Sequence, residues 1–246
     1  MPFIDPENGH LTVLNLFKTD RPERVDRLVS EMCAIVDTAA FPGWISSTVH
    51  RGQRNMGTAN FIQWRGKQDL ESRYAGDEFK HHTVPVFHEI TTFMRLMQTE
   101  VESSQRHPGE GDVTEISPDR DDFTVIEILG VEPADQSDLV SVLGAAHQWL
   151  VDVPGYRSQT VLRGIRSRGP QGDGNLRAIG TDNDFVVVYS QWDGEQSYDT
   201  LHALAAGEQP AAWRKTQDKR NALTTATDWN TYRVVHTRSA PQPALA

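Results

Sequence analysis

Two asparagines and a tryptophan lie in strand-like segments of this 246-residue chain, where polar side chains are costly to bury. Asn15 belongs to the apolar, β-prone run 11–17, and Asn60 and Trp64 belong to the run 59–64. Side chains alternate along a strand, so Asn60 and Trp64 share one face of theirs. A buried carboxamide needs a hydrogen-bond partner in the protein or in a ligand. If the two runs are neighbouring strands, two amides and an indole N–H converge on one surface and can stabilise an oxygen that gains negative charge.

An internal repeat organises the chain around these segments. Matching landmarks recur in the same order at a constant shift of 112 residues, and the last pair recurs at a shift of 128. The second copy therefore has about 16 extra residues, within the Gly-, Asp- and Asn-rich stretch 166–183, which we expect to form a hairpin tip. The matched landmarks are 11–16 with 123–128, 42–44 with 154–156, 51–52 with 163–164, and 63–64 with 191–192.

Each copy shows the element order β-α-β-β-α-β, which predicts two ferredoxin-like domains of α+β class. We expect domains at 9–102 and 121–238, joined by a polar linker at 103–120. In this topology the strand order is 4-1-3-2, so the first and third strands are neighbours. One sheet face takes the helices, and the other must be covered by a second copy. The tandem chain is therefore expected to form an intramolecular dimeric α+β barrel.

These features resemble the antibiotic biosynthesis monooxygenase superfamily of dimeric α+β barrels. The resemblance is carried by the early strand 11–15, by the Pro-Gly-aromatic motif at 42–44, and by Asn-x-x-x-Trp at 60–64. It covers both halves and is more specific for the fold than for the reaction. Among anthrone-type oxygenases the matched positions are catalytic, so the resemblance implies catalytic roles for Asn15, Asn60 and Trp64.

The implied reaction oxidises a polycyclic aromatic polyketide, an anthrone- or angucycline-type phenol, with dioxygen. The substrate enolate is electron-rich and can pass an electron to dioxygen itself, so no cofactor or metal is required. Donors aimed at the enolate oxygen stabilise its charge, and the product is a quinone or a cleaved ring. Tandem chains of this length also resemble ring-opening members, which implies reduced flavin (FADH2 or FMNH2) as a diffusible cosubstrate, supplied by a flavin reductase.

Further residues are expected to bind the substrate. A histidine with a pKa near neutrality would help to deprotonate a phenol. The residues expected around the substrate are His50, Tyr74, His82, Phe87, His88 and Trp192. In the second copy Glu127 replaces Asn15 and Val188 replaces Asn60, so we expect that half mainly to complete the barrel, although Glu127 could serve as a base in a pocket of its own.

Two alternatives remain open. Haem-degrading relatives add a histidine iron ligand on the second helix, where this chain has Tyr74, with His81 and His82 displaced by several residues. A shifted Soret band on adding haemin would support that reading. The same fold could also be a non-enzymatic barrel that binds an aromatic ligand. Substituting Asn60→Ala separates the last case, because a structural amide predicts lost stability rather than lost turnover.

Composition limits the partners and the compartment. With 24 Lys+Arg against 34 Asp+Glu, the formal charge is −10. The basic residues are scattered and do not form the basic stripe that binding to nucleic acid requires. No apolar run approaches the roughly 20 residues that span a bilayer, and the N-terminus is not signal-like. The single cysteine, Cys33, permits no internal disulfide. We expect a cytoplasmic protein, either a monomer with an internal pseudo-dimer or a homodimer.

Overall fold

Each half of the chain forms a four-stranded antiparallel sheet with helices on one face, in a computed structural model that describes residues 1–170, 176–179, 182–205 and 207–241. The first half contains β2 (Leu11–Lys18), α1 (Pro22–Thr38), β3 (Trp44–Gly52), β4 (Gly57–Trp64), α2 (Lys67–Ala75), a π-helical turn (Phe79–Thr83), α3 (Val84–Ile90) and β5 (Phe93–Arg106). The second half contains β7 (Phe123–Val131), α4 (Gln136–Ala145), α5 (His147–Leu150), β8 (Tyr156–Pro170), β9 (Leu176–Ile179), β10 (Phe185–Trp192), α6 (Glu195–His202), α7 (Ala211–Leu223) and β11 (Thr224–Ser239).

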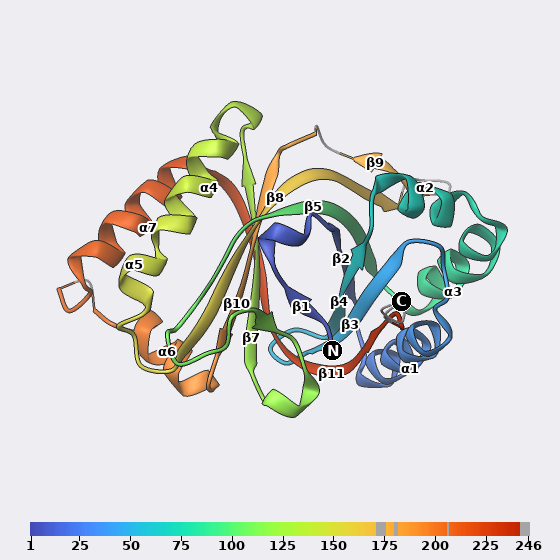
Figure 1. Cartoon of the computed structure of the whole chain (residues 1–246), viewed down its shortest axis with the longest axis horizontal. Coiled ribbons are helices and arrows are strands. Elements are labelled where there is room, and N and C mark those ends of the chain that lie inside the picture. The colour runs from blue at the N-terminus through green and yellow to red at the C-terminus, as the bar shows by residue number, and fades with distance from the viewer. Residues whose placement is uncertain (171–175, 180–181, 206, 242–246) are drawn as a thin grey trace, which may run out of the picture.

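The two sheets join into one closed barrel. The first half has the order β3-β4-β2-β5 and the second β11-β7-β10-β8. Strand β5 then pairs with β8, and β11 pairs with β3, so the last strand of each half joins the second strand of the other. The helices of the two halves cover opposite sides of this barrel (Figure 1). The duplicated ferredoxin-like topology and the intramolecular barrel are confirmed.

Alternation along the strands produces two kinds of core. The interior of the barrel takes one face of every strand and is filled by Leu14, Phe61, Ile126 and Tyr189, among others. The opposite faces pack against the helices in separate clusters in each half. Strand β2 is therefore buried on both faces over 11–17. Asn15 lies on the outer, helix-covered face, because the interior positions are taken by its neighbours Leu14 and Leu16.

Several element boundaries differ from those expected. Strand β5 continues to Arg106, past the expected end of the first domain at residue 102, because it pairs with β2 along its first part and with β8 from Leu96 onward. The expected linker begins inside β5, and within it β6 (Thr114–Glu115) pairs with the N-terminal strand β1 (Phe3–Ile4). The helix α7 was not predicted, since 211–223 shows little apolar periodicity.

The extra residues of the second copy lengthen a strand. Strand β8 runs on to Pro170 and pairs with β9, so the expected hairpin at 166–183 forms in its described part. Residues 171–175 and 180–181 of that hairpin, and 242–246 of the tail, lie outside the described residues. In the described part of the chain, no helix is long and apolar enough to cross a membrane.

Candidate active site

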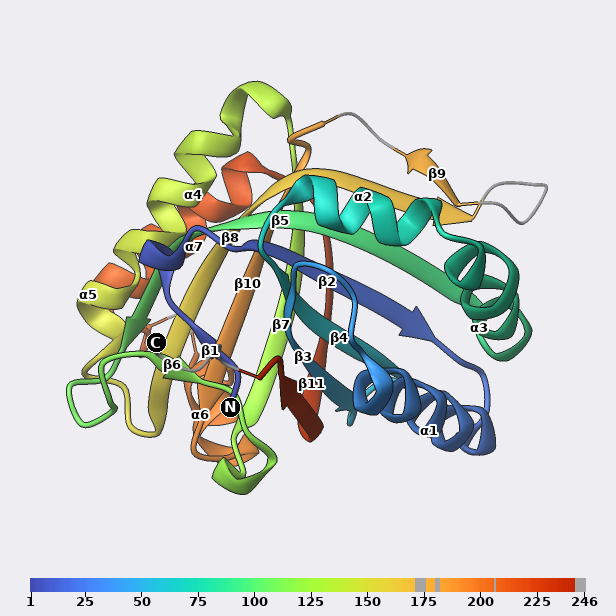
Figure 2. The same ribbon diagram turned by 45° about the vertical axis from the view of Figure 1, so that its right-hand side comes forward.

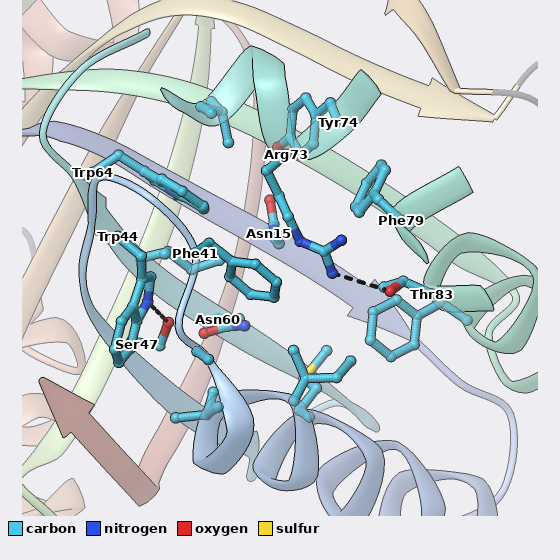
Figure 3. Close-up of a pocket in the computed structure, with 17 residues that line it drawn as sticks. Asn15, Phe41, Trp44, Ser47, Asn60, Trp64, Arg73, Tyr74, Phe79 and Thr83 are labelled. Carbon is cyan, nitrogen blue, oxygen red and sulfur yellow. Dashed lines mark hydrogen bonds between the residues drawn. The ribbon is translucent and has the colours of Figure 1, made fainter. Parts of the chain in front are cut away.

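A cavity lies between the outer sheet face of the first half and its helices. Its empty volume is about 590 Å³, a figure that includes the open space at its mouth. Figure 3 shows polar groups from β2, β4 and α2 pointing into this mainly apolar space. The lining residues are Asn15, Met32, Ile35, Val36, Ala39, Phe41, Trp44, Ser47, Asn60, Ile62, Trp64, Leu70, Arg73, Tyr74, Phe79, Thr83 and Phe87.

The two asparagines form a pair on the floor of the cavity. Asn15 on β2 and Asn60 on β4 are directly opposite in the antiparallel register, which brings their side chains together on one face. Each residue is 9% exposed, and the side-chain oxygen of each is buried without a hydrogen-bond partner. Rotating either amide by 180° presents its N–H group instead, so both can donate to an oxygen in the cavity.

The indole of Trp64 borders the same cavity. Trp64 is 3% exposed, and its Nε1 is buried without a partner. By contrast, the indole of Trp44 is satisfied, because its Nε1 donates to Ser47 Oγ at 2.9 Å. Buried donors are nearly always paired in folded proteins. Trp64 is thus a second kind of donor available to a bound molecule.

Helix α2 supplies the roof. Leu70, Arg73 and Tyr74 stand at positions i, i+3 and i+4 and face the sheet together. The hydroxyl oxygen of Tyr74 is buried without a partner. Burial raises the pKa of this phenol, and the positive charges of Arg168 and Arg73 oppose that rise only in part. Tyr74 therefore stays protonated at neutral pH and can donate a proton or a hydrogen bond.

The guanidinium of Arg73 is the one charged group among the described lining residues. It forms an ion pair with Glu78 and donates from Nη2 to Thr83 Oγ1 at 3.3 Å, with a side chain only 9% exposed. It stacks over the ring of Phe41, 4.1 Å from the centroid. Arg73 was not predicted as a site residue. The signal in the sequence was its spacing of three residues from Leu70, which puts both side chains on the inward face of the helix. An arginine is buried at such a position only if a charged or polar partner pairs with its guanidinium.

The substrate-binding residues expected from the sequence are only partly brought together. Tyr74 and Phe87 line the cavity, as expected. His82 is exposed, because Phe79, Thr83 and Phe87, four residues apart, take the inward face of the turn and of α3.

The other expected residues lie elsewhere. His88 is half-buried and is not part of the lining, although its Nε2 is buried without a partner. His81 is exposed, so the geometry favours neither it nor His82 as a ligand to haem iron in this cavity. His50 and Trp192 were also misplaced. His50 points into the barrel interior, and Trp192 lines a different pocket in the second half.

His50 makes the stability of the barrel depend on pH. It is fully buried, its Nε2 lies 2.9 Å from the hydroxyl of Tyr189, and burial lowers its pKa from 6.5 to about 4. The folded state thus binds fewer protons than the unfolded state between these values, so the stability present above pH 6.5 is lost as the pH falls. We expect a loss of about 2 kcal/mol between pH 7 and 5 from this group.

Urea denaturation at both pH values measures this dependence. The variant His50→Leu is expected to lose that part of the pH dependence, whereas His82→Gln, at an exposed position, keeps it. An unchanged difference in His50→Leu would show that other groups cause it.

The equivalent pocket in the second half has a different character. Glu127 occupies the position of Asn15 and is held by Arg220 of α7 at 3.0 Å, with both side chains about 15% exposed. Trp192 donates to Ser190 Oγ at 3.1 Å. Among the described residues lining this pocket, no buried side-chain atom lacks a partner. Glu127 therefore belongs to an ion pair rather than standing free as a base.

Comparison with solved structures gives a match over the whole chain. A crystal structure of an anthrone oxidase-like protein is 45% identical to this chain, covers 100% of both chains and has a TM-score of 0.89. A proposed monooxygenase from Fusobacterium nucleatum is 8% identical over 94% of each chain, with a TM-score of 0.56. Another from Lactobacillus acidophilus NCFM is 12% identical, covers 94% of this chain and 96% of that one, and has a TM-score of 0.52. These two share the fold alone.

No protein-family model matches the sequence, and no curated protein matches it.

Proposed function

We propose that this chain, which belongs to the anthrone oxidase-like proteins, oxidises an anthrone-type polycyclic phenol with dioxygen. The observation that carries the proposal is a set of four buried polar atoms without partners in one apolar cavity. These are the amide oxygens of Asn15 and Asn60, Trp64 Nε1 and the Tyr74 hydroxyl. Orphaned polar atoms on this scale are costly in a folded protein, so a ligand is their natural partner.

The cavity suits a substrate that becomes an anion. Deprotonation of an anthrone creates an enolate, whose oxygen can accept hydrogen bonds from the amides of Asn15 and Asn60. The positive charge of Arg73 lies in the same cavity, and both effects lower the pKa of the bound substrate. No carboxylate or histidine is among the described lining residues. In our proposal water therefore accepts the proton, and the protein supplies the stabilisation.

Oxidation then follows from the electron density of the enolate. The carbanion carbon passes one electron to dioxygen, and recombination of the two radicals forms a peroxide anion at that carbon. This anion takes back from water the proton that the substrate lost. Loss of water from the peroxide leaves a carbonyl, so one oxygen atom enters the quinone and the other leaves as water. Trp64 and Tyr74 can donate to the peroxide, and the apolar walls keep bulk water from the intermediates. We propose that the chain's own residues suffice for this sequence, with reduced flavin as the alternative reductant.

Oxygen uptake tests the proposal directly. Purified protein is mixed with 1,8-dihydroxyanthrone in air-saturated buffer containing catalase, with and without chemically reduced FMN. Uptake above the uncatalysed rate without flavin, with anthraquinone as product, is the expected result. Conversion of the phenol above the protein-free rate only when reduced flavin is present would move the activity to the flavin-dependent, ring-opening type. No uptake in either arm would contradict an oxygenase of this class and favour a binding role.

A further inference from the structure

A row of side chains crosses from the first half into the second on the outer face of the sheet. In the register, Asn60 on β4 faces Asn15 on β2, Asn15 faces Leu96 on β5, and Leu96 faces Arg168 on β8. Residues directly opposite in antiparallel strands have side chains on the same face. Strands are spaced about 5 Å apart, so the backbone of Arg168 lies about 10 Å from that of Asn15. An arginine of the second half thus shares the face that carries the asparagine pair.

Arg168 contacts the roof of the cavity. Its guanidinium carbon lies 5.5 Å from the centroid of the Tyr74 ring, within the range of a cation–π interaction. Its Nε is buried and has no hydrogen-bond partner. Arg168 is not among the lining residues, so it reaches the cavity only through Tyr74. Tyr74 is therefore flanked by two cations, Arg73 from its own helix and Arg168 from the other half.

The placement of Arg168 depends on the residues that only the second copy has. Gly52, the last residue of β3, aligns with Gly164 at the shift of 112 residues, yet β8 continues beyond that point to Pro170. Figure 2 shows this extension and β9 running past the barrel toward α2. Arg168 lies on the extension and has no counterpart on β3.

We propose that Arg168 is a positioning residue that orients the Tyr74 phenol in the first-half cavity, so that the second half completes the catalytic pocket of the first. The inference rests on the proposed oxidation for its kinetic readout. Physically, the cation over the ring restricts the rotation of a side chain whose hydroxyl has no hydrogen-bond partner to hold it in place. This gives the extension of β8 a role that symmetric completion of a barrel would not require.

The experiment is a double-mutant cycle. Arg168→Gln keeps most of the side-chain length without the charge, and Tyr74→Phe removes only the hydroxyl. We expect Arg168→Gln to lower kcat for 1,8-dihydroxyanthrone about 10-fold and to raise KM as well, and Arg168→Lys to recover most of both changes. In the Tyr74→Phe background, Arg168→Gln is expected to have no further effect. Melting temperatures establish that each variant is folded.

A matched control is available in Arg54. It also crosses between the halves, because its guanidinium carbon lies 4.8 Å from the centroid of the Trp229 ring in the second half. It lies outside the first-half cavity. Arg54→Gln is therefore expected to leave kcat unchanged. Equal losses in Arg54→Gln and Arg168→Gln would overturn the proposal, as would an undiminished effect of Arg168→Gln in the Tyr74→Phe background.

A binding readout separates this inference from the proposed function. The dissociation constant of 1,8-dihydroxyanthraquinone is measured by quenching of tryptophan fluorescence. The proteins compared are the wild type, Arg168→Gln, Tyr74→Phe and the double variant. If Arg168→Gln weakens binding only when Tyr74 is present, the positioning role is supported. This holds even if the wild type shows no turnover, and in that case only the proposed oxidation fails. Additive effects on the dissociation constant, or no binding to the wild type, would overturn the inference.

Discussion

Substituting Asn60→Leu is expected to lower kcat for anthrone oxidation by about 10²- to 10³-fold while the protein stays at least as stable as the wild type. The first part follows because a donor aimed at a developing oxyanion contributes on this scale. The second follows because the amide oxygen of Asn60 is buried without a partner, so the folded protein loses no hydrogen bond and gains apolar contact. Oxygen-uptake kinetics and urea denaturation of the same preparation measure the two effects. Asn15→Leu is expected to behave alike.

The matched control is Asn230, another largely buried asparagine on a strand. Its Nδ2 donates to the carbonyl oxygen of Asn55 at 3.0 Å, and its Oδ1 accepts from the backbone N–H of Asn55 at 2.8 Å. Asn230→Leu breaks both bonds and should cost about 1–3 kcal/mol of stability with little change in kcat. If Asn60→Leu instead destabilises the protein as Asn230→Leu does and keeps its turnover, Asn60 is structural and the cavity has another use.

The sequence predicted the fold well because its signals are local and duplicated. Alternating apolar strands, helical spacing and a repeat with ordered landmarks all specify one topology, and a lone sheet with a bare face requires a partner. The convergence of Asn15, Asn60 and Trp64 followed from the same alternation. In adjacent antiparallel strands, every second side chain points to the same face of the sheet.

The sequence could not predict groups whose positions depend on irregular backbone. The π-helical turn at Phe79–Thr83 sets which residues after α2 face inward, and this placed His82 outside the cavity. His50 was misplaced for a different reason. His50 directly follows Val49 on β3, so the two side chains point to opposite faces of the strand. Because this strand is buried on both faces, the alternation alone does not say which face is the barrel interior. Arg73 was missed because a charged residue in a short polar helix usually lies in water.

The two halves have come to use equivalent positions differently. In the first half, the asparagine pair has no internal partner, whereas in the second Glu127 is neutralised by Arg220. The Glu127–Arg220 pair leaves no unpartnered buried polar atom among the described residues that line its pocket, whereas the first-half cavity keeps four such atoms for a ligand. The asymmetry of hydrogen bonding, rather than the symmetric fold, thus concentrates the proposed chemistry in one half.

Substituting Arg73→Met is expected to lower kcat/KM for anthrone oxidation by about 100-fold and to shift the pH–rate profile to higher pH. Arg73 is the one charge among the described lining residues, so its removal raises the pKa of the bound substrate and reduces the enolate present at neutral pH. Stability should change by less than about 1 kcal/mol, because the partner Glu78 is 56% exposed and stays hydrated without the pair. Oxygen uptake between pH 6 and 9 measures the shift.

Arg220→Met provides the opposite pattern in the other half. The side chain of Glu127 is 16% exposed, so losing Arg220 leaves a mostly buried carboxylate unpaired. We expect Arg220→Met to lower the free energy of unfolding by more than Arg73→Met does and to leave kcat/KM and the pH–rate profile unchanged. A pH–rate profile that stays in place in Arg73→Met, or moves equally in Arg220→Met, would mean that the Arg73 charge does not stabilise the enolate. The reaction would then depend on the neutral donors Asn15, Asn60 and Trp64 alone.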